Sequence, residues 1–366
     1  MGGSRPRRTA SMADIARAAG VSVTTVSHVV NKTRPVAIDT ERAVLAAIAD
    51  RGYVPDNASR SMRSAGSQTI GLAMSVLSNP YFTELVSSIE QAVSGAGFSL
   101  LLAETHDDAA EELRAVTELV ARKVEAVVLA PSADPSAALE VARQADIPVL
   151  LIDRFLDADV DQIASESVVP TAELVDHLAG SGHRRIAMIS GLAGLSTTEE
   201  RIAGFRLGMR RHRLRVDPEL VVSGESDGAR AEIVIRELLA LPEPPTAVLV
   251  GNNQMTIGVI RGAGRAGVDV PGDLAVVSFD DFEWADLFHP RLTVVAQPVQ
   301  AMGQQAVSMV MSRLRDRSLP ARRVVLRPTF VHRDSCGCHR DSIVAVVPTD
   351  VPRAIADALP SSTGAA

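Results

Sequence analysis

The stretch "SMADIARAAGVSVTTVSHVVN", residues 11–31, decides how the chain begins to fold. Ser11 is a favourable helix N-cap, and Asp14 places a negative charge in the first turn, where the helix dipole stabilises it. Apolar residues then recur at helical spacing on one face: Ile15, Ala16 and Ala19. Gly20 follows, and glycine readily adopts the positive φ that ends a helix. These features predict a first helix that stops at Gly20.

The second half of this stretch, residues 22–31, is rich in β-branched residues, whose intrinsic propensity disfavours a helix. A second helix is nevertheless predicted, because Ser22 can cap it and because a helix gathers three valines on one face for burial. These valines are Val26, Val29 and Val30, and the opposite face carries Thr24, Thr25, Ser27 and His28.

Two short helices around a glycine turn are typical of the helix-turn-helix, whose second helix lies in the major groove of DNA. The hydroxyls and the imidazole of the polar face are side chains that hydrogen-bond to base edges there. A helical hairpin inside some other core is the alternative.

Residues 37–56 weaken that alternative, because they add a third helix. Asp39 or Thr40 is expected to cap this helix, and Gly52 is expected to end it. Three apolar residues are expected to face inward: Val44, Leu45 and Ile48.

The charge distribution separates a head from a body. Residues 1–65 carry ten Lys and Arg against five Asp and Glu, whereas the rest of the 366 residues carry 27 against 39. A basic head on an acidic body indicates a module for a polyanion, with a solvated basic tail as the alternative. No apolar run reaches the ~20 residues that span a bilayer, and the N-terminus lacks the apolar region of a signal peptide. With only Cys336 and Cys338 and no disulfide framework, we expect a cytoplasmic protein without a membrane partner.

From residue 69 onward, apolar runs alternate with helical segments. Strands are predicted at 69–76, 98–104, 124–130, 147–153, 161–165, 184–190, 246–250 and 274–280. Helices are predicted from about 81, at 109–122, between 130 and 147, and at about 170–180, 197–212, 228–240 and 254–266. This alternation is typical of parallel sheets covered by helices on both faces. The predicted fold is a small all-α helix-turn-helix DNA-binding domain plus an α/β domain of two Rossmann-like parallel-sheet subdomains.

The motifs of the chain, in their order, resemble the lac-repressor (LacI/GalR) family of bacterial transcription regulators. They are "TTVSHVVNKTRPVA" (24–37), "LSNPYF" (77–82), "LIDR" (151–154), "GHRRIAMISG" (182–191), "ERIAGFR" (200–206), "PTAVLVGNNQM" (245–255) and "VVSFDD" (276–281). The first of them is most similar to the purine repressor within that family. The resemblance covers roughly residues 9–338 and implies a periplasmic-binding-protein-like effector domain that closes on a small molecule.

The resemblance also implies how the chain is divided. A DNA-binding headpiece is expected at 9–56, a hinge helix and linker at 57–66, an effector-binding and dimerisation domain at 67–338, and a flexible tail at 339–366. The N-lobe of the effector domain is expected at about 67–164 and 297–327, and the C-lobe at about 165–296 and 328–338. The tail lacks leucine heptads, so a homodimer is expected rather than a tetramer.

The hinge, "NASRSMR" at 57–63, is too short to be a stable helix alone. The resemblance implies that it folds only on the operator, with Met62 wedged into a central base step and Arg60 and Arg63 at phosphates or the groove edge. Such wedges are easiest at a pyrimidine–purine step. The expected partner is therefore double-stranded DNA, a palindromic operator with a central CpG.

In the head, Thr24, Thr25 and His28 are expected to contact base edges, and Ser27 lies on the same DNA-binding face. Ser22, Asn31 and Thr33 are expected to contact phosphates or to position the helix. Val23, where the lac repressor has an aromatic residue, is expected to touch a thymine methyl.

Polar and aromatic residues follow the predicted strands, at the edge where such sheets bind ligands. The N-lobe side comprises Ser78, Asn79, Tyr81, Phe82, Asp153 and Arg154, and the C-lobe side comprises Arg201, Asn252 and Asp280. In the family, the positions matching Asp153, Arg201, Asn252 and Asp280 line the effector pocket. An arginine with carboxylates suits a sugar, a sugar derivative or a purine-like metabolite.

Phe82 and Trp284 are expected to stack on or cover a ring of the effector; a surface or interface anchor is the alternative for Trp284. The chain also departs from its relatives near this pocket. It has Asn252-Asn253 where they usually read Asn-Asp, and Glu166-Ser167 where they usually read Asp-Asn. These changes put the identity of the effector in doubt, not the fold.

Other motifs predict little chemistry. No nucleophile has a recognisable base beside it, so no catalytic residue and no cofactor are expected. "CGCH" at 336–339 offers three soft ligands without the usual C-x₂₋₄-C pair or a fourth partner, so no metal is expected. "RGAGRAG" at 261–267 is interpreted as loop glycines at a helix end. A cytoplasmic solute-binding or enzymatic α/β protein with an N-terminal docking module remains the alternative to the repressor.

Overall fold

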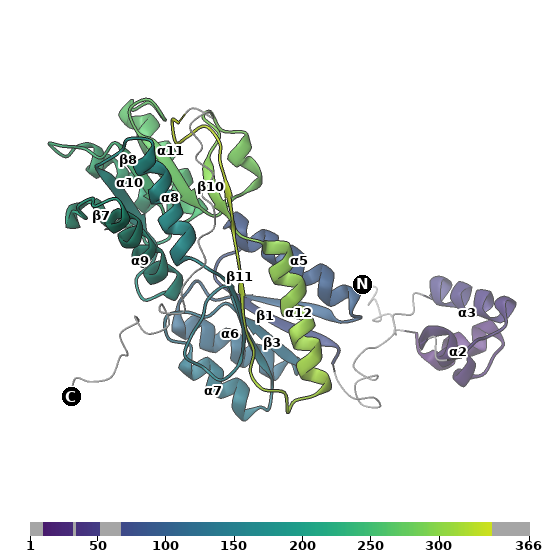
Figure 1. The fold of residues 1–366 in the computed structure, drawn as a ribbon. Helices are drawn as coiled ribbons and strands as arrows, with labels where there is room; N and C mark the ends of the chain where they lie inside the picture. Colours follow the sequence, from purple (N-terminus) through teal and green to yellow (C-terminus); the bar gives the residue numbers. More distant parts are fainter. Residues whose placement is uncertain (1–9, 32–33, 52–66, 339–366) are drawn as a thin grey trace, which may run out of the picture. The chain divides into compact units, whose positions relative to one another are not determined.

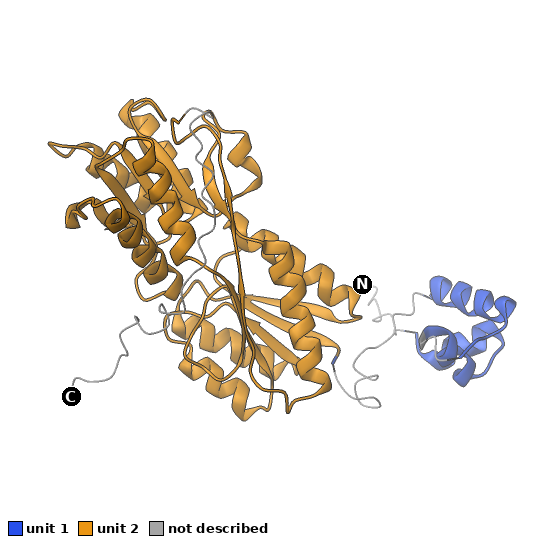
Figure 2. Ribbon diagram, in the orientation of Figure 1, with its two compact units in different colours: residues 1–67 blue, residues 68–366 orange. Residues whose placement is uncertain are grey.

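The computed structural model describes residues 10–31, 34–51 and 67–338. The chain forms two compact units, residues 1–67 and 68–366 (Figure 2). Several predictions lie outside the described residues: Thr33, Gly52, the hinge with Arg60, Met62 and Arg63, and the tail from residue 339.

The first unit contains helices α1 (Met12–Ala19), α2 (Val23–Asn31) and α3 (Ile38–Arg51). The caps predicted for α1 are confirmed: Ser11 and Asp14 form a reciprocal capping box, and Gly20 takes the left-handed conformation with φ 68°. Ile15, Val26 and Val44, one from each helix, are fully buried against one another. Helix α2 therefore forms despite its β-branched residues, because its cap and its buried valines outweigh propensity.

Two details predicted for α3 are wrong. The helix begins at Ile38, so Asp39 and Thr40 lie inside its first turn rather than capping it. Leu45 is 52% exposed, whereas Ala47 is buried. The reason is the phase of the helix, since the buried stripe runs through positions 44 and 47 and position 45 lies about 100° away from 44.

The second unit contains two six-stranded sheets, each covered by helices on both faces (Figure 1). The N-lobe sheet has the order β11-β5-β4-β3-β1-β2. Its strands are β1 (Thr69–Met74), β2 (Ser99–Glu104), β3 (Ala126–Leu129), β4 (Val149–Ile152), β5 (Asp161–Ser165) and β11 (Arg323–Leu326). Its helices are α5 (Pro80–Gly95), α6 (Ala109–Ala121), α7 (Ser136–Gln144) and α12 (Val299–Arg315), of which α5 packs beside α12 and α6 beside α7.

The C-lobe sheet has the order β12-β10-β9-β8-β6-β7. Its strands are β6 (Ile186–Ser190), β7 (Val221–Ser223), β8 (Ala247–Val250), β9 (Ala275–Phe279), β10 (Thr293–Ala296) and β12 (Thr329–Val331). Its helices are α8 (Val168–Gly180), α9 (Ser196–Arg211), α10 (Gly228–Leu239) and α11 (Asn253–Ala266), with the short turns η1 (Pro218–Leu220) and η2 (Glu283–Asp286). Each sheet buries apolar side chains on both faces, as parallel sheets require.

The pattern of alternation missed β7 and the elements at the end of the domain. It did not predict β7, β10, α12, β11 or β12, four of which are strands of three or four residues. β12 pairs antiparallel with β10, so the C-lobe sheet is not wholly parallel. The chain passes between the lobes at residues 166–167, 297–298 and 327–328, as the order of strands in the two sheets shows.

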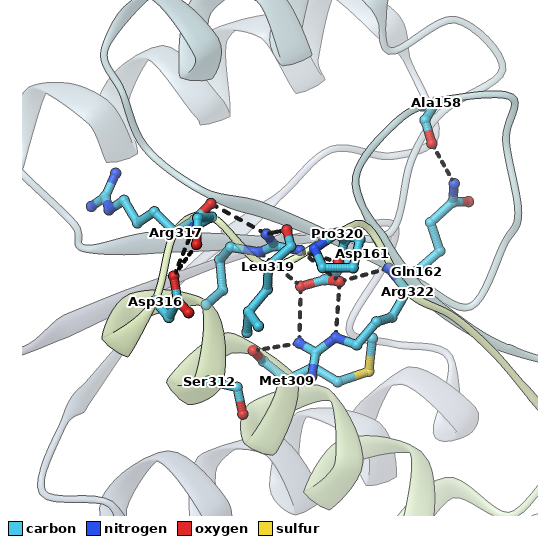
Figure 3. A network of polar contacts seen from close by, with 12 residues as sticks. Ala158, Asp161, Gln162, Met309, Ser312, Asp316, Arg317, Leu319, Pro320 and Arg322 are labelled. Atoms are coloured by element: carbon cyan, nitrogen blue, oxygen red, sulfur yellow. Dashed lines mark hydrogen bonds and ion pairs between the residues drawn. The ribbon is translucent and has the colours of Figure 1, made fainter.

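Asp161 attaches α12 and β11, the segment that returns from the C-lobe, to strand β5 of the N-lobe sheet (Figure 3). Its buried carboxylate, at the start of β5, accepts hydrogen bonds from the guanidinium of Arg313 at 3.1 and 3.2 Å and from that of Arg322 at 3.1 and 3.2 Å. The backbone N–H of Arg322 donates a further bond of 2.9 Å. Burying a carboxylate is costly unless it is paired, and here two guanidinium groups offset that cost. The contacts hold α12 and β11 against β5.

The glycines of "RGAGRAG" are not loop glycines, with one exception. α11 continues through Ala266, and only Gly267, with φ 72°, lies beyond it as a left-handed cap. Gly262 lies inside the helix, where a Cβ would collide with Ile235 of α10.

Among the residues that the structure describes, no helix is long and apolar enough to cross a membrane.

Candidate functional site

The polar face of α2 is the candidate DNA-reading surface of the first unit. Val23 is 47% exposed and Thr24 is also exposed, whereas Thr25, Ser27 and His28 are half-buried. The predicted cap is confirmed, because the Thr25 N–H donates to Ser22 Oγ at 3.0 Å. The two hydroxyls of Ser22 and Thr25 are also 2.8 Å apart. Asn31 is the last residue of the helix.

In the second unit, a small cavity of about 40 Å³ lies between the lobes, at the carboxyl ends of their strands. Six predicted effector residues line it: Tyr81, Phe82, Asp153, Arg201, Asn252 and Asp280. Asn79 and Arg154, from the same strand ends, line it as well. Residues from both halves of the chain thus meet in one place.

Two predicted residues do not line the cavity. The Ser78 carbonyl accepts a hydrogen bond of 3.2 Å from Gln254 of α11, so Ser78 joins the lobes beside the cavity rather than in it. Trp284 lies on η2, is 53% exposed, and packs edge-on against Phe282 with 6.4 Å between ring centroids. In this structure it is a surface side chain, and its stacking over a ligand stays a prediction.

Asp153 and Asp280 occupy corresponding places in the two lobes. Asp153 follows β4 with φ 76°, and Asp280 follows β9 with φ 71°. Left-handed backbone is strained for residues other than glycine, and such residues cluster at functional sites. Both side chains are buried, at 5% and 3% exposure. The fold therefore bears a cost to place two carboxylates at the lobe boundary.

Each carboxylate already has partners. Asp153 accepts a hydrogen bond of 2.6 Å from the Tyr81 hydroxyl and pairs with Arg154 Nε at 3.1 Å. Asp280 accepts a bond of 2.6 Å from the Gln297 amide and lies 3.8 Å from Arg201 Nη2. These contacts hold the carboxylates in defined positions before any ligand arrives.

Arg201 reaches the cavity from α9. Its Nη1 donates to the Gly251 carbonyl at 2.5 Å, and its guanidinium carbon lies 3.9 Å from the centre of the Phe279 ring. Its Nε is buried without a hydrogen-bond partner among the described residues. The guanidinium is thus oriented by backbone and ring, with donor capacity left over.

Burial dominates the electrostatics of the site. It raises the pKa of Asp280, although the positive charge of Arg201 and the Gln297 amide oppose the shift. It also raises the pKa of Tyr81 well above 10, and the neighbouring Asp153 carboxylate adds to that shift. Tyr81 is therefore a neutral hydrogen-bond donor rather than a nucleophile. The set can bind hydroxyl and carbonyl groups, with carboxylates as acceptors and guanidinium groups as donors.

Sequence reasoning missed part of the lining. The missed residues are Gly191, Leu195, Thr197, Thr198, Ser226 and Gly251. They lie in the loops after β6, β7 and β8 or at the start of α9, at the same sheet edge as the predicted residues. A complete strand prediction points to most of them, but β7 is too short to be predicted, so nothing pointed to Ser226.

The departures from the family occupy defined places. Asn253 is fully buried at the start of α11, and neither its amide oxygen nor its nitrogen has a hydrogen-bond partner in the described part of the chain. Glu166 lies at a lobe crossing, where its carboxylate accepts a bond of 2.9 Å from the Val169 N–H at the start of α8. Burial raises the pKa of Glu166.

Comparisons with known proteins agree with this architecture. Residues 11–56 match the bacterial regulatory proteins of the lacI family, and residues 175–336 match a periplasmic binding protein-like domain. Over 328 residues the chain is 31% identical to the HTH-type transcriptional repressor PurR of Photobacterium profundum, covering 89% of this chain and 98% of that one. It is 32% identical over 328 residues to the ribose operon repressor of Escherichia coli, covering 89% and 99%.

The crystal structure of the lac repressor dimer bound to operator and the anti-inducer ONPF has a TM-score of 0.78 to this structure, with 26% identity, covering 90% of this chain and 99% of that one. The protein has the architecture of a helix-turn-helix regulator with a periplasmic-binding-protein-like sensor domain. It belongs to the LacI family of bacterial regulatory proteins and is a DNA-binding transcriptional repressor, as its relatives are, rather than an enzyme.

Proposed function

We propose that the protein is a homodimeric repressor that a small polar metabolite controls by binding between the lobes. The observation that carries this proposal is the pair of buried, left-handed aspartates, Asp153 and Asp280, which line one cavity together with Arg201. Carboxylates from both lobes and one arginine can grip a ligand from two sides. Asn252 is better suited to shaping the wall, since its side chain accepts the Met255 N–H at 2.8 Å and caps α11.

The cavity is too small to admit a metabolite unless the site opens. A volume of about 40 Å³ holds a few water molecules, whereas pockets for metabolites span ~300–1,000 Å³. A ligand therefore needs the lobes or the lining side chains to move apart. A larger groove of about 830 Å³ lies at the amino ends of β4 and β5, near Val149 and Asp161. Ligands of parallel sheets bind at the carboxyl ends of strands, so that groove is not the effector site.

The chemistry of the lining favours a ligand with several hydroxyl groups. A sugar or a sugar derivative fits best, and a purine-like metabolite remains the alternative, with Tyr81 and Phe82 as the aromatic neighbours. The similarity to a ribose operon repressor supports the sugar.

The DNA partner is a palindromic operator with a central CpG. In the head, Thr24, Thr25 and His28 read bases, with Ser27 on the same face. Val23 contacts a methyl group, and Ser22, Asn31 and Thr33 contact phosphates or position the helix. The related lac repressor is a dimer on its operator, which supports the homodimer. The roles of the hinge residues Arg60, Met62 and Arg63 on the operator are inferred from the family resemblance alone. A repressor works where the chromosome is, so we infer that the protein is cytoplasmic.

Two measurements on the full chain test the proposal. Thermal-shift screening with sugars, sugar acids and purines should give a ligand that raises the melting temperature, because binding to the native state stabilises it. Adding that ligand to a gel shift with the protein's own upstream DNA should change operator affinity. A ligand that stabilises the protein without changing operator affinity at any concentration contradicts effector control.

A further inference from the structure

Four metal-binding side chains meet at the outer end of the C-lobe sheet, away from the effector cavity. His177 comes from α8, His332 follows β12 directly, and Cys336 and Cys338 lie in the turn beyond it. The ligand atoms of all four lie within 4.8 Å of one another. Sequence reasoning weighed only the "CGCH" motif with His339, which lies outside the described residues. It did not include His177 and His332, because these histidines lie outside the motif in the sequence and only the fold brings them beside the cysteines.

The distances between these atoms resemble those around a single ion. His332 Nε2 lies 2.9 Å from Cys338 Sγ and 3.2 Å from Cys336 Sγ. The two sulfurs are 3.4 Å apart, and His177 Nε2 is 3.4 Å from Cys338 Sγ. Around a tetrahedral zinc ion with bonds of about 2.0–2.3 Å, ligand atoms lie roughly 3.3–3.8 Å apart. An ion therefore fits after small outward movements of the side chains.

The backbone explains how the short Cys-x-Cys spacing can work. Gly337, between the cysteines, takes φ 71°, and its N–H donates to the Asp334 carbonyl at 3.1 Å. The turn is fixed to the sheet beside it: Ser335 Oγ donates to the Val276 carbonyl at 2.7 Å and accepts the Thr293 N–H at 2.8 Å. The carboxylate of Asp334 also receives two bonds from Arg291, at 2.7 and 3.0 Å. The cluster is thus built on a fixed turn rather than a loose chain end.

We propose that His177, His332, Cys336 and Cys338 form a structural zinc site. Two thiolates and two imidazoles in a tetrahedral set are the ligands that select zinc, and four protein ligands leave no open position for catalysis. On binding, the two thiols release their protons to the solvent and bind as thiolates. Cys336 is fully buried, and His177, His332 and Cys338 are half-buried, so the site is close to closed.

The ion would fasten the end of the described chain to the C-lobe. α8 begins directly after the first lobe crossing, and β12 begins directly after the third. A zinc ion between His177 and the turn after β12 therefore links these two segments, which are far apart in the sequence. Its role is to stabilise the C-lobe, and it does not depend on which effector the other site binds.

The test uses the full chain without a histidine tag, reduced, stripped with a chelator and then given Zn²⁺. Metal analysis after removal of unbound ion should find about one zinc per chain, and Co²⁺ in its place should give the visible bands of a tetrahedral thiolate site. Zinc should raise the melting temperature by about 5 °C or more, since a bound ion stabilises the native state.

Variants assign the ligands. Cys338→Ser and His332→Gln should each lose the bound zinc and the zinc-dependent thermal shift, while His289→Gln, at an exposed histidine outside the cluster, should retain both. Circular dichroism of the metal-free variants checks that they are folded. A reduced wild-type chain that binds less than a tenth of an equivalent of zinc overturns the proposal. So does zinc binding that survives in both Cys338→Ser and His332→Gln. If the cysteines form a disulfide and the reduced chain still binds no zinc, the pair is a redox couple and the proposal is equally wrong.

Discussion

At the scale of single residues, Arg201 is the side chain that most directly tests the effector site. It lines the cavity, is oriented by Gly251 and Phe279, and belongs to the unit that does not contain the DNA-reading helix. Arg201→Ala removes a charge-assisted donor, so we expect effector affinity to fall ~tenfold or more. Operator affinity without effector should stay within about twofold. Calorimetry and gel shifts measure the two affinities.

The matched control is Arg206→Ala, which removes an exposed arginine from the same helix, α9. It should leave effector affinity unchanged. Unaltered effector binding by Arg201→Ala would place the effector site elsewhere.

His28 tests base reading in the same way. It lies on the polar face of α2, opposite the buried Val26 and Val29. We expect His28→Ala to cost ~1–3 kcal/mol per half-site and to relax the preference at one base pair. Selection of binding sites from random DNA measures both effects, and non-specific DNA is the control, since its affinity should change little. An unchanged consensus at unchanged affinity would show that His28 reads no base.

At the scale of elements, the attachment of α12 and β11 to β5 depends on Asp161. Burial alone would raise the pKa of this carboxyl, but hydrogen bonds from Arg322 and Arg313 more than offset it and lower the pKa. A lowered folded-state pKa adds stability above the unfolded value of ~3.8, and this stability is lost as the pH falls through the folded value. Asp161→Asn should therefore lower the free energy of unfolding by about 3 kcal/mol at pH 7. The deficit should narrow below pH ~4.

Urea unfolding at several pH values measures this difference. Asp146→Asn is the control, because Asp146 is 93% exposed and its ion pair with Arg317 lies at the surface, where such pairs contribute ~0–1 kcal/mol. A deficit of equal size in both variants, or one that does not change with pH, would contradict the account of Asp161.

Helix α11 offers a matched pair of glycines. A Cβ at Gly258 would collide with the carbonyl oxygen of Gly228 in α10, whereas a Cβ at Gly264 would meet nothing within 4 Å. Alanine is favoured over glycine inside a helix by ~1 kcal/mol. We expect Gly264→Ala to raise the melting temperature slightly and Gly258→Ala to lower it by several degrees, because α10 and α11 must separate. Equal shifts of the melting temperature for the two variants in scanning calorimetry would show that α10 and α11 can separate without loss of stability.

The elements also show what sequence could and could not predict. Capping chemistry and burial predicted α1 and α2, and eight segments were predicted as strands, because these signals are local. The strands β7, β10, β11 and β12 were not predicted, and their pairing is decided by distant segments. The residues named after the predicted strands include eight that line the cavity, but Ser226 follows an unpredicted strand. His177 and Cys338 are 161 positions apart, so only the fold shows that they meet.

At the scale of the whole molecule, one variant determines whether the effector is an inducer or a corepressor. A ligand shifts an equilibrium between two lobe arrangements only if it binds one of them more tightly, and a coupling of ~1–3 kcal/mol makes a useful switch. Arg201→Ala is expected to weaken the binding of the ligand without changing the DNA-reading helix. If the ligand is an inducer, the cell carrying this variant should repress permanently. If it is a corepressor, the same cell should fail to repress, and a reporter gene behind the operator distinguishes the two.

The three passages between the lobes, at 166–167, 297–298 and 327–328, make the lobes inseparable by a single break in the chain. After one peptide bond in any of them is cleaved, two covalent connections remain. Each lobe also keeps a sheet assembled from non-contiguous segments, with β11 and β12 supplied from the far end of the sequence. Neither lobe can therefore be expressed as one continuous segment of the chain. Truncation before residue 323 removes an edge strand from both sheets at once.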